Sequence, residues 1–168
     1  MSWAARGRYT LVLVSAIILQ LGVFSDIRIG GVHPDITLLV AIVAGLVAGP
    51  RRGAVIGFWA GLLIDPVLTT TPFGMTALVW ALVGLGAGLA EESINSHTSL
   101  GLSLFVLGGS AAGSLAYAVV GELFGAQTFA SSNVGRIIGL ISATNALLAL
   151  PAIAIVEWAE EDRSNITH

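Results

Sequence analysis

Long apolar stretches, separated by short segments that carry nearly all of the charge, constrain the fold of this sequence more than any other feature. Only 10% of its 168 residues are charged, whereas a soluble domain carries roughly 25%. Backbone polar groups in lipid must be satisfied inside helices. The sequence therefore predicts an all-α integral membrane protein, a compact bundle of about six transmembrane helices. The predicted spans of this single domain, 1–168, cover approximately residues 9–24, 34–49, 53–65, 72–90, 98–121 and 137–156.

Side chains suited to catalysis or to cofactor binding are sparse. The chain has no cysteine, and its net charge of −3 offers no basic surface for nucleic acid. His33, His97 and His168 fall in different loops or in the tail, without the spacing of metal ligands. No nucleotide-binding motif is present. We therefore expect no enzyme activity, no cofactor and no metal site.

The arginines predict the orientation in the membrane. With six spans, five of the seven arginines fall on one side, and positive residues are enriched on the cytoplasmic side. Both termini are therefore predicted to be cytoplasmic. Trp3 and Trp158 would then lie near the inner interface, which indole rings favour. The inside set is Arg6, Arg8, Arg51, Arg52 and Arg163, and the outside set is Arg28 and Arg136.

The second and third predicted spans are short for a bilayer. Residues 53–64 would reach about 18 Å at 1.5 Å per residue, against a hydrocarbon core of about 30 Å. One interpretation is a re-entrant hairpin, which would place Arg51 and Arg52 near the bilayer centre at roughly 2.5–3.5 kcal/mol each. The other is a pair of true spans lengthened by residues 32–34 and 65–66. We favour the second because it keeps both arginines in water.

Prolines and polar residues mark the predicted helix ends. Pro34 and Asp35 place a proline and an acid at the start of the second span, where both are tolerated. Thr71 and Pro72 repeat this pattern at the start of the fourth span. Residues 49–53 read Gly-Pro-Arg-Arg-Gly and predict a tight turn between the second and third spans.

Glycines recur every four residues in the third span. Gly53, Gly57 and Gly61 share one helical face and would allow a neighbouring backbone to approach closely. Residues 84–88 and 109–113 repeat the GxxxG spacing. Two interpretations stay open: packing within the bundle, which is the commoner use, and docking of a second membrane protein.

Two acids, Asp35 and Asp65, are predicted to lie at the same membrane face. Paired carboxylates suit acid–base chemistry or cation binding, but we favour helix termination and pairing with Arg28 or Arg136. Asp65 follows a predicted helix instead of preceding one, so the helix dipole is not expected to stabilise it. It is therefore expected to need a partner.

Polar residues elsewhere predict structural roles. Gln20 and Asn145 lie inside predicted spans, where such side chains usually form hydrogen bonds between helices. Residues 123–135 predict a long loop. The acidic segment at 157–162 is expected to be a solvated end.

The region from residue 34 to residue 78 carries an ordered set of motifs. It begins Pro34-Asp35-Ile36-Thr37-Leu38-Leu39, continues through glycines to Gly57-Phe58 and Gly61-Leu62-Leu63, and ends with Asp65 and Gly74. This set resembles the pattern of MreD, a bacterial rod shape-determining membrane protein. The resemblance implies partner-binding roles for Pro34, Asp35, Gly53, Gly57, Phe58, Gly61, Asp65 and Gly74.

The resemblance also implies a function. It indicates a non-enzymatic scaffold of the cell-elongation machinery in the bacterial cytoplasmic membrane, which binds MreC through helices two to four. Through MreC it would contact the MreB filament and peptidoglycan synthases. Family members are similar in fold to the six-helix substrate-binding subunits of energy-coupling-factor vitamin transporters. The alternative function is therefore vitamin uptake with a separate ATPase, in which Trp59, Trp80 and Glu122 are candidate ligand contacts.

Overall fold

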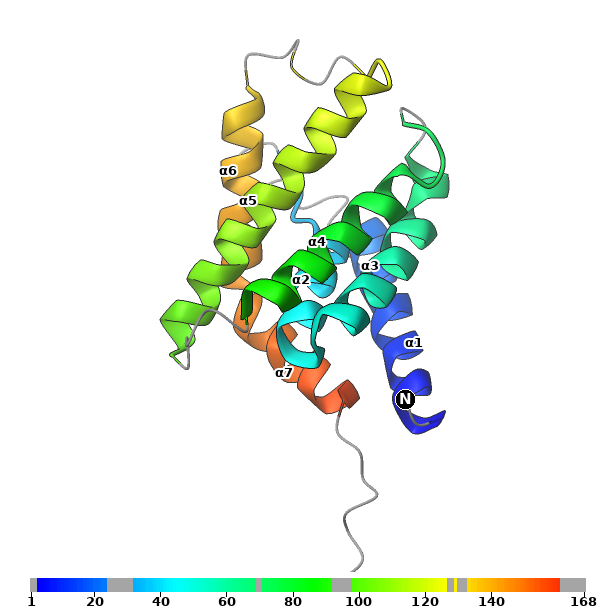
Figure 1. Cartoon of the computed structure of the whole chain (residues 1–168), viewed down its shortest axis with the longest axis vertical. Helices are drawn as coiled ribbons and strands as arrows, with labels where there is room; N and C mark the ends of the chain where they lie inside the picture. Colours follow the sequence, from blue (N-terminus) through cyan, green and yellow to red (C-terminus); the bar gives the residue numbers. More distant parts are fainter. Residues whose placement is uncertain are drawn as a thin grey trace, which may run out of the picture.

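Helices make up nearly all of the part of the chain that the computed structural model describes, which is residues 3–23, 32–68, 71–91, 98–126, 129 and 133–160. These residues form seven α-helices and no β-strand (Figure 1), which confirms the predicted helical fold. The predictions for Arg28, His97, Arg163 and His168 concern residues outside this part. The elements are α1 (Trp3–Ile18), η1 (Leu19–Val23), α2 (Ile36–Ala48), α3 (Pro50–Ile64), η2 (Asp65–Val67), α4 (Met75–Glu91), α5 (Ser99–Leu123), α6 (Val134–Leu147) and α7 (Ala149–Glu160).

Helix α2 lies at the centre of the bundle (Figure 1). Every residue from Ile36 to Gly45 is buried, and α2 packs against α1, α3, α4, α5 and α7. A helix that is apolar on all sides is surrounded either by lipid or by other helices, and α2 is surrounded by other helices. The second predicted span is therefore the core around which the other helices assemble.

The helices differ in whether their length suits a bilayer. Among the described helices, α5 is the one that is long and apolar enough to cross a membrane alone, and α6 with α7 meets the same criterion only as a pair bent by 57°. Helix α5 has 25 residues and so reaches about 37 Å at 1.5 Å per residue. Helices α1, α2 and α4 are apolar but shorter.

The sixth predicted span, 137–156, corresponds to two helices, α6 and α7, and not to one. It starts earlier, at Val134, ends later, at Glu160, and is broken at Leu148. Pro151 has no N–H to donate to the carbonyl group of Leu147, and its ring crowds that carbonyl. The proline therefore explains the bend.

Two further predicted boundaries are corrected. The turn between α2 and α3 is a single residue, Gly49, whose φ of 84° is a conformation that glycine adopts at little cost. Pro50 already occupies the first turn of α3, where a proline is well suited, so α3 begins three residues before the predicted span. Helix α4 begins at Met75 and not at Pro72, because its cap comes from another helix.

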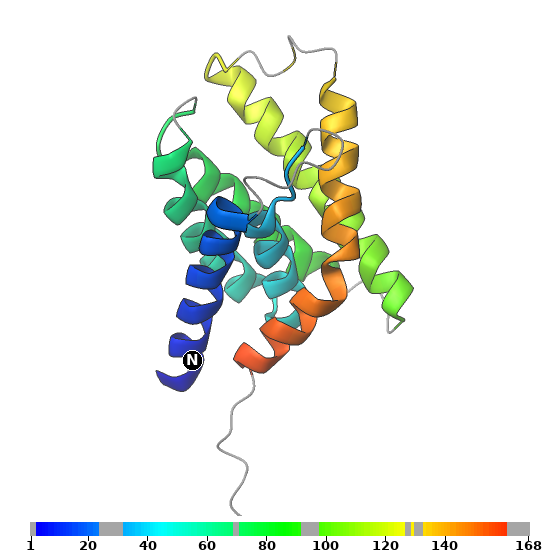
Figure 2. The same cartoon turned by 180° about the vertical axis from the view of Figure 1, so that it is seen from behind.

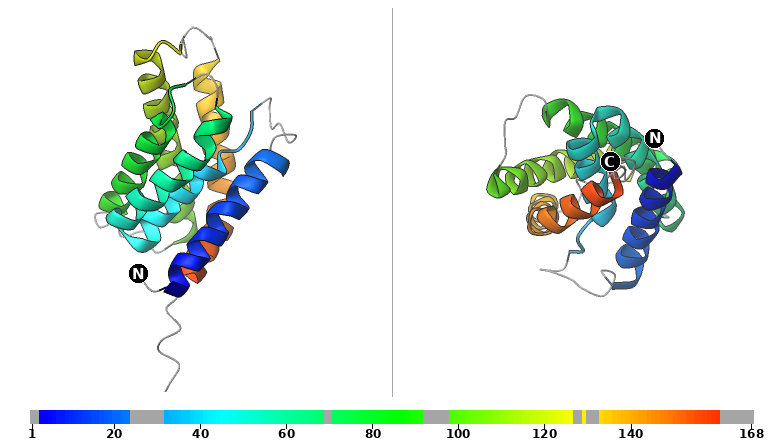
Figure 3. Two further views of the ribbon diagram at one scale, coloured as in Figure 1. Left: turned by 90° about the vertical axis from the view of Figure 1, so that its right-hand side faces the viewer. Right: turned by 90° about the horizontal axis from the view of Figure 1, so that it is seen from below.

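The start of α1 and the end of α7 lie at the same end of the bundle, and the two helices pack side by side (Figure 3). We call this the terminal end. The start of α2, the end of α3 and the start of α4 lie at the opposite end (Figure 1), which we call the capping end.

Candidate partner-binding site

The glycine face of α3 is filled by α4. A Cβ atom added at Gly57 would come closer than 3.0 Å to the backbone of Trp80, and one added at Gly61 equally close to the backbone of Ala77. At Gly53 the obstructing atoms belong to Gly84 and Gly45. The three glycines therefore serve packing within the bundle, the first of the two interpretations left open by their spacing.

Partner binding through these glycines stays a prediction. A partner would contact them directly only if α3 and α4 moved apart, because backbone atoms of α4 occupy the space in front of them. Phe58 differs, since its side chain is 42% exposed on the outside of α3. There it packs edge-on against Trp59, with 5.9 Å between the ring centroids.

Asp65 is the N-terminal cap of α4. Its carboxylate accepts hydrogen bonds from the backbone N–H groups of Gly74 (2.9 Å), Thr76 (3.2 Å) and Ala77 (3.4 Å), and the residue is 3% exposed. The positive end of a helix dipole stabilises a carboxylate placed in this way. The expectation that the helix dipole would not help Asp65 is therefore wrong. Among the described residues its partners are these amides and not an arginine.

Gly74 completes this cap. Its φ of 91° is a backbone conformation that side chains with a Cβ rarely adopt. In this conformation its N–H group points at Asp65 Oδ2. Two predicted residues that are nine positions apart thus act together at the start of α4.

Asp35 caps α2 as predicted. Its Oδ1 accepts hydrogen bonds from the backbone N–H of Leu38 (2.9 Å) and from the hydroxyl of Thr37 (2.8 Å). Thr37 Oγ1 in turn accepts a hydrogen bond from Trp80 Nε1 at 3.2 Å. This chain of contacts joins the start of α2 to α4, so the caps of both helices belong to one packed unit.

Gln20 and Asn145 both form hydrogen bonds at the start of α2. They come from η1, at the end of α1, and from α6, and α1 and α6 lie on either side of the start of α2 (Figure 2). Gln20 donates to the carbonyl of Pro34 (3.1 Å) and accepts from the N–H of Ile36 (2.8 Å). Asn145 donates to the carbonyl of Asp35 and to the hydroxyl of Ser110, both at 3.1 Å. The predicted role of these two residues, hydrogen bonding between helices, is confirmed.

A groove between α4 and α5 escaped the sequence analysis. It has a volume of about 650 Å³ and is lined by larger apolar side chains together with small residues, including Gly86, Ala90, Gly108, Ala112 and Ala116. A Cβ atom added at Gly86 or at Gly108 would meet nothing within 4 Å. The GxxxG pair at 109–113 lines the groove as well, and the further signal in the sequence was the small-residue spacing 86–90 and 108–112–116.

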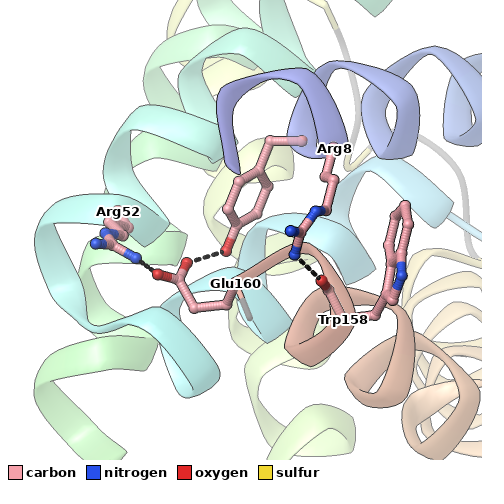
Figure 4. Close-up of polar contacts among 5 residues, drawn as sticks. Arg8, Arg52, Trp158 and Glu160 are labelled. Atoms are coloured by element: carbon pink, nitrogen blue, oxygen red, sulfur yellow. Dashed lines mark hydrogen bonds and ion pairs between the residues drawn. The ribbon is translucent and has the colours of Figure 1, made fainter. Parts of the chain in front are cut away.

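Charged residues gather at the terminal end (Figure 4). Glu160 forms an ion pair with Arg52 and accepts a hydrogen bond from the Tyr9 hydroxyl at 2.8 Å. Arg8 donates to the carbonyl of Trp158 at 2.8 Å, and its guanidinium lies 5.6 Å from the centroid of that indole ring. Glu160 therefore joins α1, α3 and α7, and the prediction of a solvated end is wrong for this residue.

Replacing Glu160 with glutamine is expected to lower the stability of the purified protein by about 1 kcal/mol or less, since part-exposed ion pairs contribute little. The measurement is the midpoint of thermal unfolding followed by tryptophan fluorescence. Glu157→Gln is the control, because Glu157 is exposed on the same helix. A larger shift for Glu157 than for Glu160 would contradict the role assigned to the ion pair.

Residues 7–108 match the family model described as rod shape-determining protein MreD. The match includes all eight residues that the resemblance singled out. No match was found among the curated proteins or among the solved structures. The similarity to vitamin-transporter subunits therefore stays a prediction.

Proposed function

Because the chain belongs to the MreD family of rod shape-determining membrane proteins, we propose that it works as a non-enzymatic scaffold that binds MreC in the cytoplasmic membrane. A role in rod-shape determination follows from the family itself. The scaffold role and the partner are the proposal. Through MreC, the protein would connect to the MreB filament and to peptidoglycan synthases.

The groove between α4 and α5 is the observation that best supports a membrane helix as partner. Helices associate in lipid chiefly through close packing at small residues. This groove presents Gly86 and Gly108, where an added Cβ atom would meet nothing within 4 Å in the described chain. The exposed side chains of Leu82 and Leu104 line it. We place the transmembrane helix of MreC in this groove.

The eight predicted residues then contribute in two ways. Pro34, Asp35, Gly53, Gly57, Gly61, Asp65 and Gly74 hold α2, α3 and α4 together and so orient the outer face of α4. Phe58 is exposed and is the one proposed to contact a partner directly. Binding through helices two to four is thus proposed to be mainly indirect, with α5 supplying the second wall of the groove.

We further propose a single multi-pass domain with both termini in the cytoplasm. The terminal end carries Arg8, Arg51 and Arg52, and Arg51 is exposed there. Enrichment of arginine at this end favours the cytoplasmic side. The capping end would then face outward.

Gly108→Leu and Gly86→Leu test the groove. Each should lower the yield of MreC in co-purification by about tenfold or more, because a leucine side chain fills the space that the partner backbone needs. Both variants should insert and fold normally, since neither glycine has a neighbour within 4 Å. In cells that depend on this protein, either variant should replace rods by rounded cells.

Gly139→Leu is the matched control for this test. Gly139 is an exposed glycine of α6 with nothing within 4 Å, and it lies outside the groove. If Gly108→Leu recovers as much MreC as the unaltered protein does, the groove is not the docking site. A loss for Gly139→Leu as large as for Gly108→Leu would do the same.

A further inference from the structure

A second cavity lies at the capping end, between the end of α1, the starts of α2 and α4, and helices α5 and α6. Its volume is about 540 Å³, within the range of roughly 300–1,000 Å³ that is typical of small-molecule sites. It shares no lining residue with the groove between α4 and α5. The cavity is therefore a separate site from the proposed MreC site, although α4 and α5 contribute to both.

The lining of this cavity combines apolar side chains with a few polar groups. Ile137, Ile138 and Ile141 of α6 are among the apolar residues. We call the polar part of the lining, which includes Asp35 and Thr76, the polar wall. Such a combination suits an amphipathic ligand, because its apolar body and its polar group each meet a matching surface.

The polar wall contains hydrogen-bonding capacity that the described part of the chain leaves unused. Thr76 is 1% exposed, and its hydroxyl has no hydrogen-bond partner there. A buried polar group without a partner is rare and normally has an explanation. The hydrogen bonds that the Asp35 side chain accepts both go to Oδ1, which leaves Oδ2 available to a donor.

The aromatic residues of this cavity indicate the charge of the ligand. Trp80 and Tyr117 both line it, with 5.4 Å between their ring centroids. Aromatic faces attract cations, and a carboxylate forms its strongest hydrogen bonds with charged donors. Among the described residues no cation pairs with Asp35.

We propose that this cavity binds an ammonium group attached to an apolar body, with the ammonium between Asp35 and the two aromatic rings and a hydrogen bond to Thr76. Two sources carry this chemistry: a soluble amphipathic amine, and the headgroup of phosphatidylethanolamine. The experiment therefore has two arms. The first tests whether the cavity binds an ammonium group, and the second tests whether the ligand is a soluble amine or the lipid headgroup.

The first arm uses tryptamine as the probe in calorimetric titration of the full-length protein, purified in dodecyl maltoside. This detergent carries no ammonium group. Saturable binding is expected for tryptamine, and none for indole-3-propionate, in which a carboxylate replaces the amine. Asp35→Asn and Thr76→Val should each weaken tryptamine binding, by about tenfold or more for Asp35→Asn, since it removes a charge-assisted hydrogen bond.

Both variants are chosen to preserve the fold. Asparagine is as good an N-terminal helix cap as aspartate, and valine has the shape of threonine. Thr144→Val is the matched control, because the Thr144 hydroxyl bonds to carbonyls of its own helix and is outside the cavity lining. It should bind tryptamine like the unaltered protein. Absence of saturable binding, or unchanged affinity in either cavity variant, overturns the proposal.

The second arm repeats the titration in lipid nanodiscs. If tryptamine binds in phosphatidylglycerol discs but is competed away in discs that contain phosphatidylethanolamine, the lipid headgroup is the ligand. If it binds equally in both, the ligand is a soluble amine. Either result supports the proposed binding site and identifies the source of its ligand.

Discussion

Gly57→Leu should prevent the protein from folding. The Cβ atom alone would come closer than 3.0 Å to the backbone of Trp80, and backbone atoms cannot rotate away as a flexible side chain can. Helices α3 and α4 would have to separate. Separation would also disturb the hydrogen bond from Trp80 to Thr37, which joins α4 to the start of α2.

A graded series makes this expectation measurable. Gly57→Ala should destabilise the purified protein by about 1–3 kcal/mol, the range for overpacking a tight core, and Gly57→Leu should leave no monodisperse protein after detergent extraction. The measurements are size-exclusion chromatography and the thermal unfolding midpoint.

Gly86→Ala is the control for this series. Gly86 is a helical glycine of α4 with nothing within 4 Å, so alanine should leave stability unchanged or raise it by up to about 1 kcal/mol. If Gly57→Leu folds as well as the unaltered protein and fails only to bind MreC, then the α3 glycine face meets the partner and not α4.

Asp65→Ala is expected to have the second-largest effect. It would leave the N–H groups of Gly74, Thr76 and Ala77 without their acceptor at a site that is 3% exposed. Loss of hydrogen bonds to a buried charge costs about 1.5–3 kcal/mol each when measured singly. Since three bonds share one carboxylate, we expect a total loss of about 2–4 kcal/mol, with rapid hydrogen exchange confined at first to residues 74–77.

Asp65→Asn separates the effect of lost hydrogen bonds on stability from the effect of a smaller side chain. Asparagine keeps one acceptor oxygen but turns an N–H₂ group toward the amides. The stability of the Asp65→Asn protein should therefore lie between those of the unaltered protein and of Asp65→Ala. Glu122→Ala is the control, because Glu122 accepts one hydrogen bond, from the N–H of Phe129, at an exposed position. It should change stability by less than about 0.5 kcal/mol. Equal stability of Asp65→Ala and Glu122→Ala would mean that α4 does not depend on this cap.

The residues that sequence reasoning placed correctly make local interactions. Asp35 caps the helix that begins at the next residue, and its main acceptor contact, with Leu38, is three positions away. Helical periodicity likewise placed Gly53, Gly57 and Gly61 on one face. Pro151 was an equally local signal for the bend between α6 and α7, and we overlooked it because the surrounding stretch is continuously apolar.

The interpretations that failed or stayed open concern partners distant in the chain. Nothing near Asp65 in the sequence shows that it caps α4, since its donors lie nine to twelve positions later. Glu160 meets Tyr9 across a separation of 151 residues, so a chain end that looked solvated is tied to α1. These pairings depend on how α1, α3, α4 and α7 are arranged in space.

Apolar composition and the positions of its few charges, prolines and glycines were enough to indicate a helical membrane protein and several of its helix ends, because burial in lipid and capping act over one or two helical turns. The tertiary structure alone decided which surface each small-residue stripe faces. Glycine spacing reports only that a backbone can approach closely, and the same spacing serves a neighbouring helix or a separate protein equally well. The packing of α4 onto α3 covers the glycine face of α3 and leaves the small residues in the groove between α4 and α5 open.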